Sequence, residues 1–327
     1  MTAHRLGIVG YGNLGRGVEL AVSLQEDMEL VGVFTRRDPA SVSTAFEGTA
    51  VHPIEALESM TGEIDVLVLC GGSKSDLPQQ TPQLAERFTV VDSFDTHARI
   101  PEHFAAVDAA AREAGTTALI STGWDPGLFS INRLFGESIL ASGATYTFWG
   151  RGLSQGHSDA LRRVDGVAGA VQYTIPSEDA IARVRAGERP ALTTREKHVR
   201  ECYVVLEEGA DADVVREAIV TMPHYFEPYD TTVHVISAEE LARDHRGMPH
   251  GGFVIRSGES SPGTAQMIEY RLQEESNPEF TASVLVAYAR AAARLAASGE
   301  HGARTPFDVA PGLLSPKSPE QLRAELL

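Results

Sequence analysis

The first part of the chain alternates between short apolar runs and amphipathic stretches. Apolar runs of this length are typical of buried strands, and the clearest helical patterns between them cover residues 14–25 and 101–114. The runs lie at residues 5–9, 28–34, 66–70, 89–92 and 118–121. Strands that alternate with helices predict a parallel sheet with helices on both faces. We therefore expect an α/β domain with a doubly wound, Rossmann-type parallel sheet.

The pattern changes after Trp124. A helical pattern covers residues 127–142, and an Ala-rich helix is expected over 278–298. Strand-like runs lie between them at residues 145–149, 200–206, 232–236, 252–257 and 264–271. Because Gly, Pro and Ser fill the turns, we expect one or two helices and a mixed, largely antiparallel sheet in a second α+β domain. The expected domains are residues 1–122, completed by 277–327, and residues 123–276.

A glycine-rich segment directly follows the first strand. Its sequence is Gly10-Tyr11-Gly12-Asn13-Leu14-Gly15, which fits G-x-G-x-x-G and opens a helix. The first glycine allows a tight turn, the second lets the backbone approach a pyrophosphate, and the third permits close helix packing. The segment predicts a dinucleotide-binding loop.

The end of the second strand indicates which dinucleotide is bound. NAD sites usually carry Asp or Glu at this place, bonded to the ribose 2′-hydroxyl. Here the segment reads Phe34-Thr35-Arg36-Arg37. Two guanidinium groups and a hydroxyl suit a 2′-phosphate, with no carboxylate to repel it. We predict NADP(H) as the cofactor.

Three further segments follow predicted strands, where ligands of such sheets bind. They are Cys70-Gly71-Gly72-Ser73, Asp92-Ser93-Phe94-Asp95-Thr96-His97 and Ser121-Thr122-Gly123-Trp124-Asp125-Pro126-Gly127. The last two place Asp95 and Asp125 at the nicotinamide side, where two carboxylates can bind an ammonium group. Alternatively, Asp125 caps a helix whose first residue is Pro126, and Asp95 is an ordinary loop acid.

Composition restricts the partners. The chain has 327 residues and a formal net charge of −17, which argues against nucleic acid and anionic membrane surfaces. No apolar run approaches the ~20 residues that span a bilayer, and the start does not read as a signal peptide, so we expect a cytoplasmic protein. Cys70 and Cys202 are too far apart in sequence to indicate a disulfide framework or a zinc site by themselves, and no metal is expected.

Together these motifs resemble a known family. The segments are Ile8–Arg16, Phe34–Arg37, Ser121–Gly127, Phe148–Gly150, Leu153–Ala160, Met248–Gly252 and Asn277-Pro278. The combination resembles the meso-diaminopimelate dehydrogenases of the corynebacterial type over nearly the whole chain. The resemblance implies reversible, NADP-dependent oxidative deamination of the D-centre of meso-2,6-diaminopimelate. The products are L-2-amino-6-oxopimelate (in equilibrium with tetrahydrodipicolinate), ammonia and NADPH, in lysine biosynthesis.

The resemblance also implies residue roles and a homodimer, formed through the substrate domain. The cofactor would be held by Gly10, Tyr11, Gly12, Asn13, Leu14, Gly15, Thr35, Arg36, Arg37, Cys70, Gly71, Gly72, Ser73, Ser93, Phe94, Asp95, Thr122, Gly123, Trp124, Asp125 and Pro126. Asp95 and Asp125 would be catalytic and hold the reacting amino group. The substrate pocket would be shaped by Trp124, Phe148, Trp149, Gln155 and Gly156. The distal L-centre would be gripped by Thr174, Arg200, His250 and Asn277, with Arg200 as carboxylate partner.

Alternatives remain open at this stage. The chain has only three lysines, Lys74, Lys197 and Lys317, which disfavours amino acid dehydrogenases that use lysine for catalysis. The general base is Asp95, Asp125, His157 or a bound water. Another NADPH-dependent D-amino acid dehydrogenase, or a reductase of the sugar or dihydrodipicolinate type, would share the cofactor domain. A redox-sensing regulator would need a basic recognition helix, which the acidic chain does not show.

Overall fold

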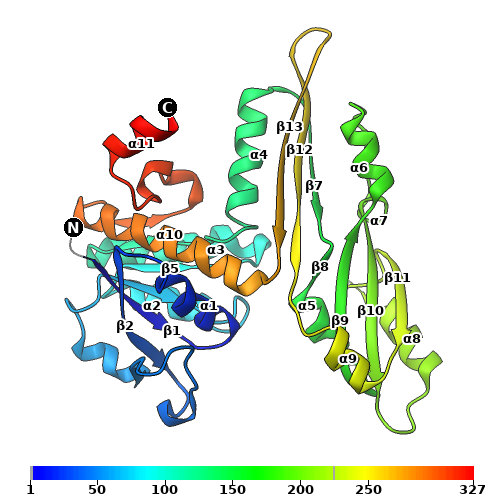
Figure 1. The fold of residues 1–327 in the computed structure, drawn as a ribbon, viewed down its shortest axis with the longest axis horizontal. Helices are drawn as coiled ribbons and strands as arrows, with labels where there is room; N and C mark the ends of the chain where they lie inside the picture. The colour runs from blue at the N-terminus through cyan, green and yellow to red at the C-terminus, as the bar shows by residue number, and fades with distance from the viewer. Residues whose placement is uncertain (1–2, 224) are drawn as a thin grey trace. The chain divides into compact units, whose positions relative to one another are not determined.

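The computed structural model describes residues 3–223 and 225–327. The chain forms two compact units, Met1–Ile131 with Pro278–Leu327 and Asn132–Asn277 (Figure 1). Among the described residues, every helix is too short or too polar to cross a membrane.

Unit 1 contains a seven-stranded parallel sheet in the order β14-β6-β5-β4-β1-β2-β3. The strands are β1 His4–Val9, β2 Met28–Thr35, β3 Val51–Pro53, β4 Val66–Leu69, β5 Val90–Asp92, β6 Thr117–Leu119 and β14 Gly302–Arg304. The helices are α1 Asn13–Val22, α2 Leu77–Ala85, α3 Ile100–Ala114, α10 Asn277–Ala297 and α11 Pro319–Leu326, with α4 Leu128–Ile139 crossing into unit 2. The predicted doubly wound parallel sheet is confirmed. Strands β3 and β14 were not predicted, because their three residues, Val51–Pro53 and Gly302–Arg304, do not form an apolar run.

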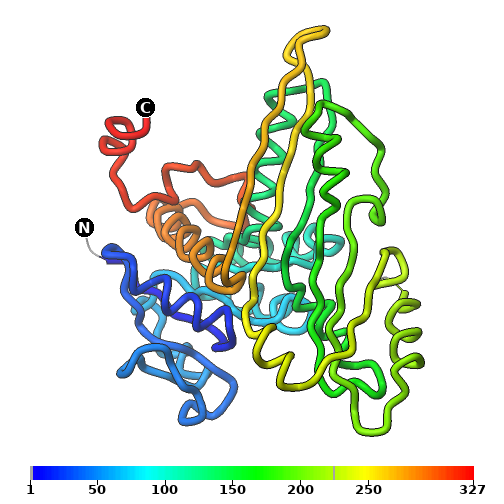
Figure 2. Tube along the Cα trace, turned by 45° about the vertical axis from the view of Figure 1, so that its right-hand side comes forward, coloured from blue at the N-terminus to red at the C-terminus, as the bar shows by residue number. Residues whose placement is uncertain are grey.

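Two apolar layers cover the sheet of unit 1. One layer joins α1 and the C-terminal α10 to β1, and the other includes residues of α2 and α3. Figure 2 follows the chain from α10 into the C-terminal segment of this unit. Gly17 of α1 permits close packing, because a Cβ there would lie 3.0 Å from the Cβ of Ala282. The expected Ala-rich helix is therefore part of the core around the first strand.

A buried ion pair ties α10 to the turn before β2. Arg290, whose side chain is 2% exposed, donates from Nε to Asp27 Oδ2 at 2.6 Å and from Nη2 to Oδ1 at 2.7 Å. Gln25 and the carbonyl of Leu314 accept the remaining hydrogen bonds. The hydrogen bond from Arg290 lowers the pKa of Asp27.

Asp27→Asn should destabilise the protein by about 3 kcal/mol at neutral pH, because the variant leaves a buried cation unpaired. A carboxyl with a lowered pKa stabilises the fold above its unfolded value of 3.8, and this contribution is lost as the pH falls through the folded value. In thermal melts of both proteins from pH 7 downward, the difference in melting temperature should therefore stay constant above about pH 4 and shrink as the pH falls below 3.8. A difference in melting temperature that stays constant below pH 3.8 as well would contradict the ion-pair account.

Unit 2 contains two sheets, in the orders β11-β10-β9-β8 and β13-β12-β7. The strands are β7 Ser142–Trp149, β8 Gly152–Leu153, β9 Val167–Pro176, β10 His198–Leu206, β11 Asp230–Val235, β12 His250–Ser261 and β13 Thr264–Glu274. Among the described strands of unit 2, only the pair of β10 and β11 is parallel, which confirms the predicted mixed, largely antiparallel pairing. Strand β9 was missed, and β12 and β13 form the long hairpin visible in Figure 2.

The prediction of one or two helices in this part of the chain is wrong. Besides α4, the structure has α5 Gln155–Leu161, α6 Glu178–Arg185, α7 Thr194–Lys197, α8 Ala212–Val220 and α9 Ala238–Asp244. Each begins after a residue whose side chain accepts a hydrogen bond from the first turn, namely Ser154, Ser177, Thr193, Asp211 and Ser237. Helices this short show little amphipathic periodicity, so these caps were the available sequence signal.

Candidate functional site

The glycine loop connects β1 to α1 and has the geometry that its sequence predicts. Gly10 has φ +88°, which favours glycine, and a Cβ on Gly15 would lie 2.3 Å from the carbonyl oxygen of Gly10. A Cβ on Gly12 would meet no atom within 4 Å, so its side of the loop is open. No side chain caps the first turn of α1. An open helix N-terminus with an uncovered glycine fits a pyrophosphate.

The two arginines after β2 differ in their contacts. The guanidinium of Arg37 donates to the carbonyl oxygen of Tyr11, which joins the end of β2 to the glycine loop. Arg36 pairs with Asp76 Oδ1 at 2.5 Å, and Asp76 Oδ2 accepts from the backbone N–H of Gly72 at 2.8 Å. The segment Phe34–Arg37 itself carries no carboxylate, but the fold places one, that of Asp76, beside Arg36. Asp76 comes from a segment 40 residues further along the chain, which the local sequence around Arg36 could not indicate.

A second carboxylate, Glu19 of α1, fixes the loop that follows η1 (Pro39–Ser41). The Glu19 side chain is buried and accepts from the hydroxyls of Tyr11 and Thr49 and from the backbone N–H groups of Ala45 and Phe46. Burial alone would raise the pKa of Glu19, but these hydrogen bonds outweigh it and the pKa is lowered. This carboxylate was not predicted from the sequence, and it accepts a hydrogen bond from Tyr11 of the glycine loop.

A cavity of about 540 Å³ lies beside Arg36 and Asp76 in unit 1. It runs between α2 and the 3-10 helix η2 (Ile54–Ser59), and its lining includes Leu57, Gln80 and Phe88. Of the residues predicted to bind the 2′-phosphate, Arg36 lines this cavity, which extends along α2 as far as Phe88.

The structure brings together the three segments that follow β4, β5 and β6. Ser73 Oγ accepts from the backbone N–H of Asp95 at 2.9 Å, which joins the first segment to the second. The backbone N–H of Thr122 donates to the carbonyl oxygen of Asp92 at 2.9 Å, which joins the second to the third. Asp95 and Asp125 therefore belong to one connected group of loops.

The capping interpretation of Asp125 is wrong. Helix α4 begins at Leu128, so Pro126 is not its first residue, and the Asp125-Pro126 peptide is cis. Trp124, the neighbour of Asp125, packs edge-on against Phe129 with ring centroids 5.0 Å apart. The loop before α4 is thus held in part by an aromatic contact.

Arg200 is the most unusual residue of unit 2. It lies opposite Thr174 in the register of β10 and β9, donates to the Thr174 hydroxyl, and is only 6% exposed. Its guanidinium stacks 3.9 Å above the centroid of the Tyr229 ring, and its Nε has no hydrogen-bond partner. No ion pair with a carboxylate is formed by Arg200 among the described residues. Burial lowers its pKa, as expected for a desolvated cation without a counter-ion.

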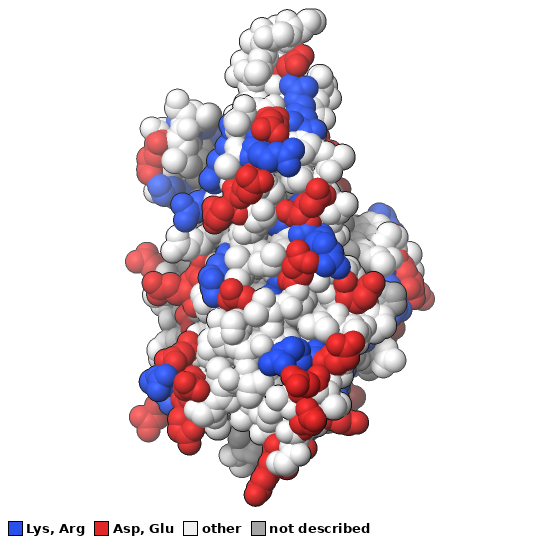
Figure 3. Space-filling model, turned by 90° about the vertical axis from the view of Figure 1, so that its right-hand side faces the viewer, with Lys and Arg blue, Asp and Glu red and all other residues white. Residues whose placement is uncertain are grey.

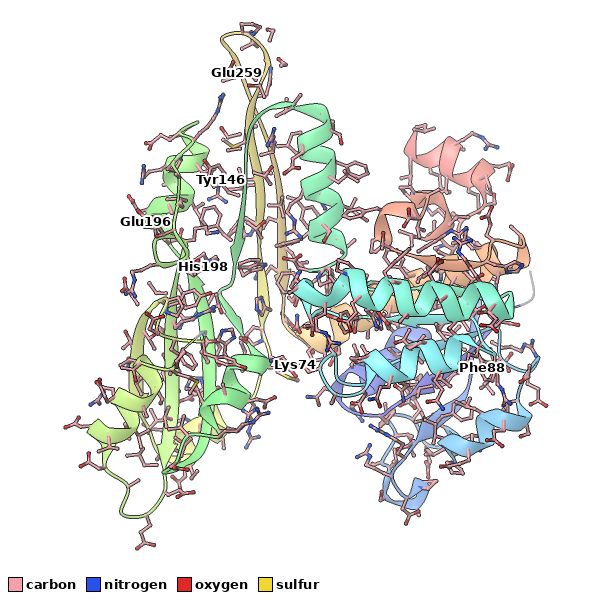
Figure 4. The ribbon with its side chains drawn as sticks, turned by 180° about the vertical axis from the view of Figure 1, so that it is seen from behind. Lys74, Phe88, Tyr146, Glu196, His198 and Glu259 are labelled. Atoms are coloured by element: carbon pink, nitrogen blue, oxygen red, sulfur yellow. The ribbon has the colours of Figure 1, made fainter. Side chains whose placement is uncertain are left out.

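Two predicted aromatic residues lie on β7. Phe148 is fully buried in an apolar cluster with Ile181 and Ile255, so it acts from inside the core. The backbone N–H of Trp149 donates to His198 Nε2 at 2.8 Å, and the two rings stack with centroids 5.3 Å apart. Burial lowers the pKa of His198 to about 3, so this imidazole stays neutral and accepts the hydrogen bond at ordinary pH. Figure 4 shows His198 at the start of β10; the sequence analysis missed it.

The other predicted residues of unit 2 gather around the segment before β12. Gln155 Nε2 lies 3.6 Å from the sulfur of Met248, and the backbone N–H of Asn277 donates to the Met248 carbonyl oxygen at 2.9 Å. His250 lies opposite Glu274 in the β12–β13 register, and Glu274 Oε2 accepts from Asn277 Nδ2 at 2.9 Å. A Cβ on Gly156 would meet open space. Burial raises the pKa of Glu274 to about 7, and the sequence analysis missed this carboxyl.

The distribution of charged side chains agrees with a site for small anions. Within the described ranges, no three His, Cys, Asp or Glu side chains are grouped as metal ligands would be. Figure 3 shows basic and acidic side chains interspersed on the face that it presents, without a continuous basic surface. The candidate binding groups for small anions are therefore single guanidinium groups, such as those of Arg36, Arg37 and Arg200.

The parallel sheet, the glycine loop and the paired arginines define a nucleotide-dependent oxidoreductase of the Rossmann type. A family described as the diaminopimelic acid dehydrogenase C-terminal domain matches residues 123–276. The meso-diaminopimelate D-dehydrogenase of Lysinibacillus sphaericus is 63% identical over the full length of both chains. The chain belongs to the meso-diaminopimelate D-dehydrogenase family, and it is an NADP-dependent oxidoreductase that acts on CH–NH₂ groups.

Solved structures agree with this assignment. The diaminopimelate dehydrogenase of Corynebacterium glutamicum in complex with DAP is similar, with a TM-score of 0.93 at 46% identity and complete coverage of both chains. An engineered D-amino acid dehydrogenase bound to NADP+ has a TM-score of 0.88 at 45% identity, again over both full chains. The suspected family resemblance is confirmed.

Proposed function

We propose that the chain catalyses the reversible oxidative deamination of the D-centre of meso-2,6-diaminopimelate, with NADP⁺ as oxidant. The products are L-2-amino-6-oxopimelate, ammonia and NADPH. The observation that carries the proposal is Arg200, a buried guanidinium that lacks an acidic partner among the described residues. A buried cation of this kind is stabilised by an anionic ligand, and a substrate with a second carboxylate supplies one.

The cofactor would be bound by unit 1. Tyr11 to Leu14 would hold the pyrophosphate, and Thr35, Arg36 and Arg37 would hold the 2′-phosphate. Residues 70–73, 93–95 and 122–126 would line the remainder. When bound, NADP⁺ supplies the hydride acceptor. The uncovered Gly12 and the uncapped first turn of α1 support this assignment.

The substrate would be bound by two sets of residues. Asp95 and Asp125 would hold the reacting ammonium group and orient it, since paired carboxylates favour a cation. Arg200 and Thr174, with His250 and Asn277, would bind the distal L-centre. Trp124, Trp149, Gln155 and Gly156 would border the pocket, with Phe148 supporting it from the core. The hydrogen bond from Trp149 to His198 supports a fixed position for Trp149.

The direct test is a product balance. Purified protein with meso-diaminopimelate and NADP⁺ should form NADPH and ammonia in equal amounts, with L-2-amino-6-oxopimelate as the carbon product. Substrate labelled with ¹⁵N only at the D-centre should release all its label as ammonia. Label retained in the carbon product would overturn the assignment of the D-centre.

Replacing Arg36 by Asp together with Arg37→Ala should raise the KM for NADP⁺ at least about 100-fold, since two charge-assisted contacts to a phosphate are worth about 3 kcal/mol or more. The KM for NAD⁺ should change little, because NAD⁺ lacks the 2′-phosphate. Steady-state kinetics with both cofactors measures the ratio. Arg323→Ala, on the exposed C-terminal helix α11, is the matched control. Equal effects on both cofactors would remove the arginines from the 2′-phosphate site.

We also propose that the protein is a cytoplasmic homodimer. Support comes from apolar side chains on α4, where Phe135 is 50% exposed and Ile139 is 66% exposed. Such side chains are typical of an interface that a second copy covers. Sedimentation equilibrium should give twice the mass of the chain, and Ile139→Glu should shift it toward the monomer.

A further inference from the structure

Asp92 holds an unusual position at the end of β5. Its side chain is 0% exposed, and it is surrounded by four hydrogen-bonding groups from four segments of unit 1. Oδ1 accepts from the backbone N–H of Phe94 at 3.0 Å and of Ser121 at 2.9 Å. Oδ2 accepts from the Thr81 hydroxyl at 2.8 Å and lies 2.8 Å from His103 Nε2. Few carboxylates are buried this completely without a lysine or arginine side chain paired to them.

The backbone of Asp92 adds two further bonds. Its carbonyl oxygen accepts from the backbone N–H of Thr122 at 2.9 Å and from the Thr122 hydroxyl at 2.8 Å. Asp92 therefore binds Phe94, one residue before Asp95, and both Ser121 and Thr122, shortly before Asp125. One residue fixes the origins of the two loops that carry the reacting carboxylates of the proposed function.

Ser121 shows that this contact determines backbone conformation. It has φ 55°, and it is the only residue other than glycine with positive φ in the described part of the chain. That conformation is unfavourable for a side chain with a Cβ, and it persists where the surroundings compensate for it. The bond from the Ser121 N–H to Asp92 Oδ1 is such a compensation, and it directs the chain after β6 into the loop of Asp125.

His103 orients the carboxylate from α3. Its ring stacks on Phe94 with centroids 4.1 Å apart, and its Nδ1 is buried without a hydrogen-bond partner. The ring therefore donates from Nε2 to Asp92, since an Nε2 without its proton would oppose a carboxylate. Thr81 of α2 supplies the second donor. Two helices thus fix the rotamer of Asp92, and Asp92 in turn fixes two loops.

We infer that Asp92 is a positioning residue of the reaction, one that sets the distance between Asp95 and Asp125 without touching the substrate. The inference rests on the proposed function for the roles of those two carboxylates. Small displacements of reacting groups are costly, because the reaction needs near-attack geometry. Loss of the Asp92 carboxylate should reduce turnover more than it reduces binding of the cofactor.

The experiment compares Asp92→Ala with Asp27→Asn in the full-length protein. Both variants should lower the melting temperature. Asp92→Ala should also lower kcat about 10- to 100-fold in folded protein, and this loss should exceed the accompanying rise in the Kd for NADP⁺. Asp27→Asn should keep kcat near that of the wild type. Equal, near wild-type kcat in both variants would overturn the inference, because Asp92 would then act only on stability.

A second pair of variants covers the case in which Asp92→Ala does not fold. His103→Phe keeps the stacking on Phe94 but removes the donor, whereas His103→Gln restores an Nε donor. We expect a severalfold lower kcat for His103→Phe and substantial recovery in His103→Gln. Equal kcat in both would contradict the role of the carboxylate as an oriented acceptor.

Hydrogen exchange separates this inference from the proposed function. In Asp92→Ala, or in His103→Phe, the backbone amides of Phe94 and Ser121 should exchange faster, while those of β4 stay protected. This readout needs no substrate. If the wild type does not oxidise meso-diaminopimelate, the proposed function fails, and unchanged exchange at both amides would separately refute the positioning role.

Discussion

Asp125→Asn should lower kcat by about 100- to 10,000-fold, the range for removing a group that assists proton transfer in the reaction. Asp125 lies beyond the end of β6, in the loop whose origin is fixed through Ser121 and Thr122. The asparagine amide is uncharged and therefore cannot hold an ammonium group by charge. Because it has nearly the same size as the carboxylate, binding of the cofactor should be unchanged. Asp95→Asn should have a comparable effect, because the two carboxylates act on one amino group.

The control for these variants is Asp213→Asn on α8. Asp213 has a side chain that is 91% exposed and pairs with Arg216 one turn along α8, so its loss should leave turnover unaffected. Stopped-flow measurement of NADPH formation isolates the chemical step from product release. If either Asp95→Asn or Asp125→Asn keeps a rate near that of the wild type, that residue does not act at the reacting centre.

His157→Gln addresses the remaining candidate for the base. His157 lies at the start of α5, where its Nδ1 is 2.8 Å from Ser154 Oγ. Its ring packs edge-on against Tyr225 and Phe226. These contacts are those of a residue that stabilises a helix start, and they favour Asp95, Asp125 or a bound water as the base. A loss of turnover in His157→Gln as large as in Asp125→Asn would instead favour His157 as the general base.

Arg200→Met should raise the KM for meso-diaminopimelate about 100- to 1,000-fold, since truncating one partner of a buried charge pair costs about 2–5 kcal/mol. The free protein should become more stable, because a buried cation without a counter-ion is replaced by an apolar side chain. Arg200→Lys should recover only part of the affinity, since an ammonium group cannot form the planar fork to a carboxylate.

A D-amino acid without a second carboxylate provides the discriminating substrate. With D-alanine, Arg200→Met should lose no efficiency relative to the wild type, because nothing in that substrate reaches the distal site. Comparison of kcat/KM for both substrates in both proteins gives the coupling energy between Arg200 and the distal carboxylate of the substrate. Parallel losses with D-alanine and meso-diaminopimelate would show that Arg200 supports the fold and does not bind the distal carboxylate.

Much of unit 1 follows from its sequence. The buried parallel strands appear as apolar runs in the sequence. The dinucleotide loop is recognisable from its three glycines, each of which meets a different steric requirement. Two contacts of unit 1 could not be predicted because they join residues far apart in the chain. Asp76 pairs with Arg36, and Asp92 accepts a hydrogen bond from the backbone N–H of Ser121, but no local sequence pattern indicates either contact.

Unit 2 was less predictable because its helices α5 to α9 are short and its strands are partly exposed. Helix α7 has four residues, and its signal lay in Thr193 and Glu196, which form a capping box. His198 was overlooked for a related reason. A histidine at the start of a strand has no distinctive sequence context, and its ring meets Trp149 through contact between two different sheets, because His198 lies on β10 and Trp149 on β7.

The most direct test of the account uses the three stereoisomers of diaminopimelate with NADP⁺. The meso isomer should be oxidised rapidly and the LL isomer not at all, because the LL isomer has no D-centre. The DD isomer should react poorly, since its distal centre does not match the site around Arg200. Folded protein that binds NADP⁺ but fails to oxidise the meso isomer, or oxidises the LL isomer equally well, would contradict the proposed function.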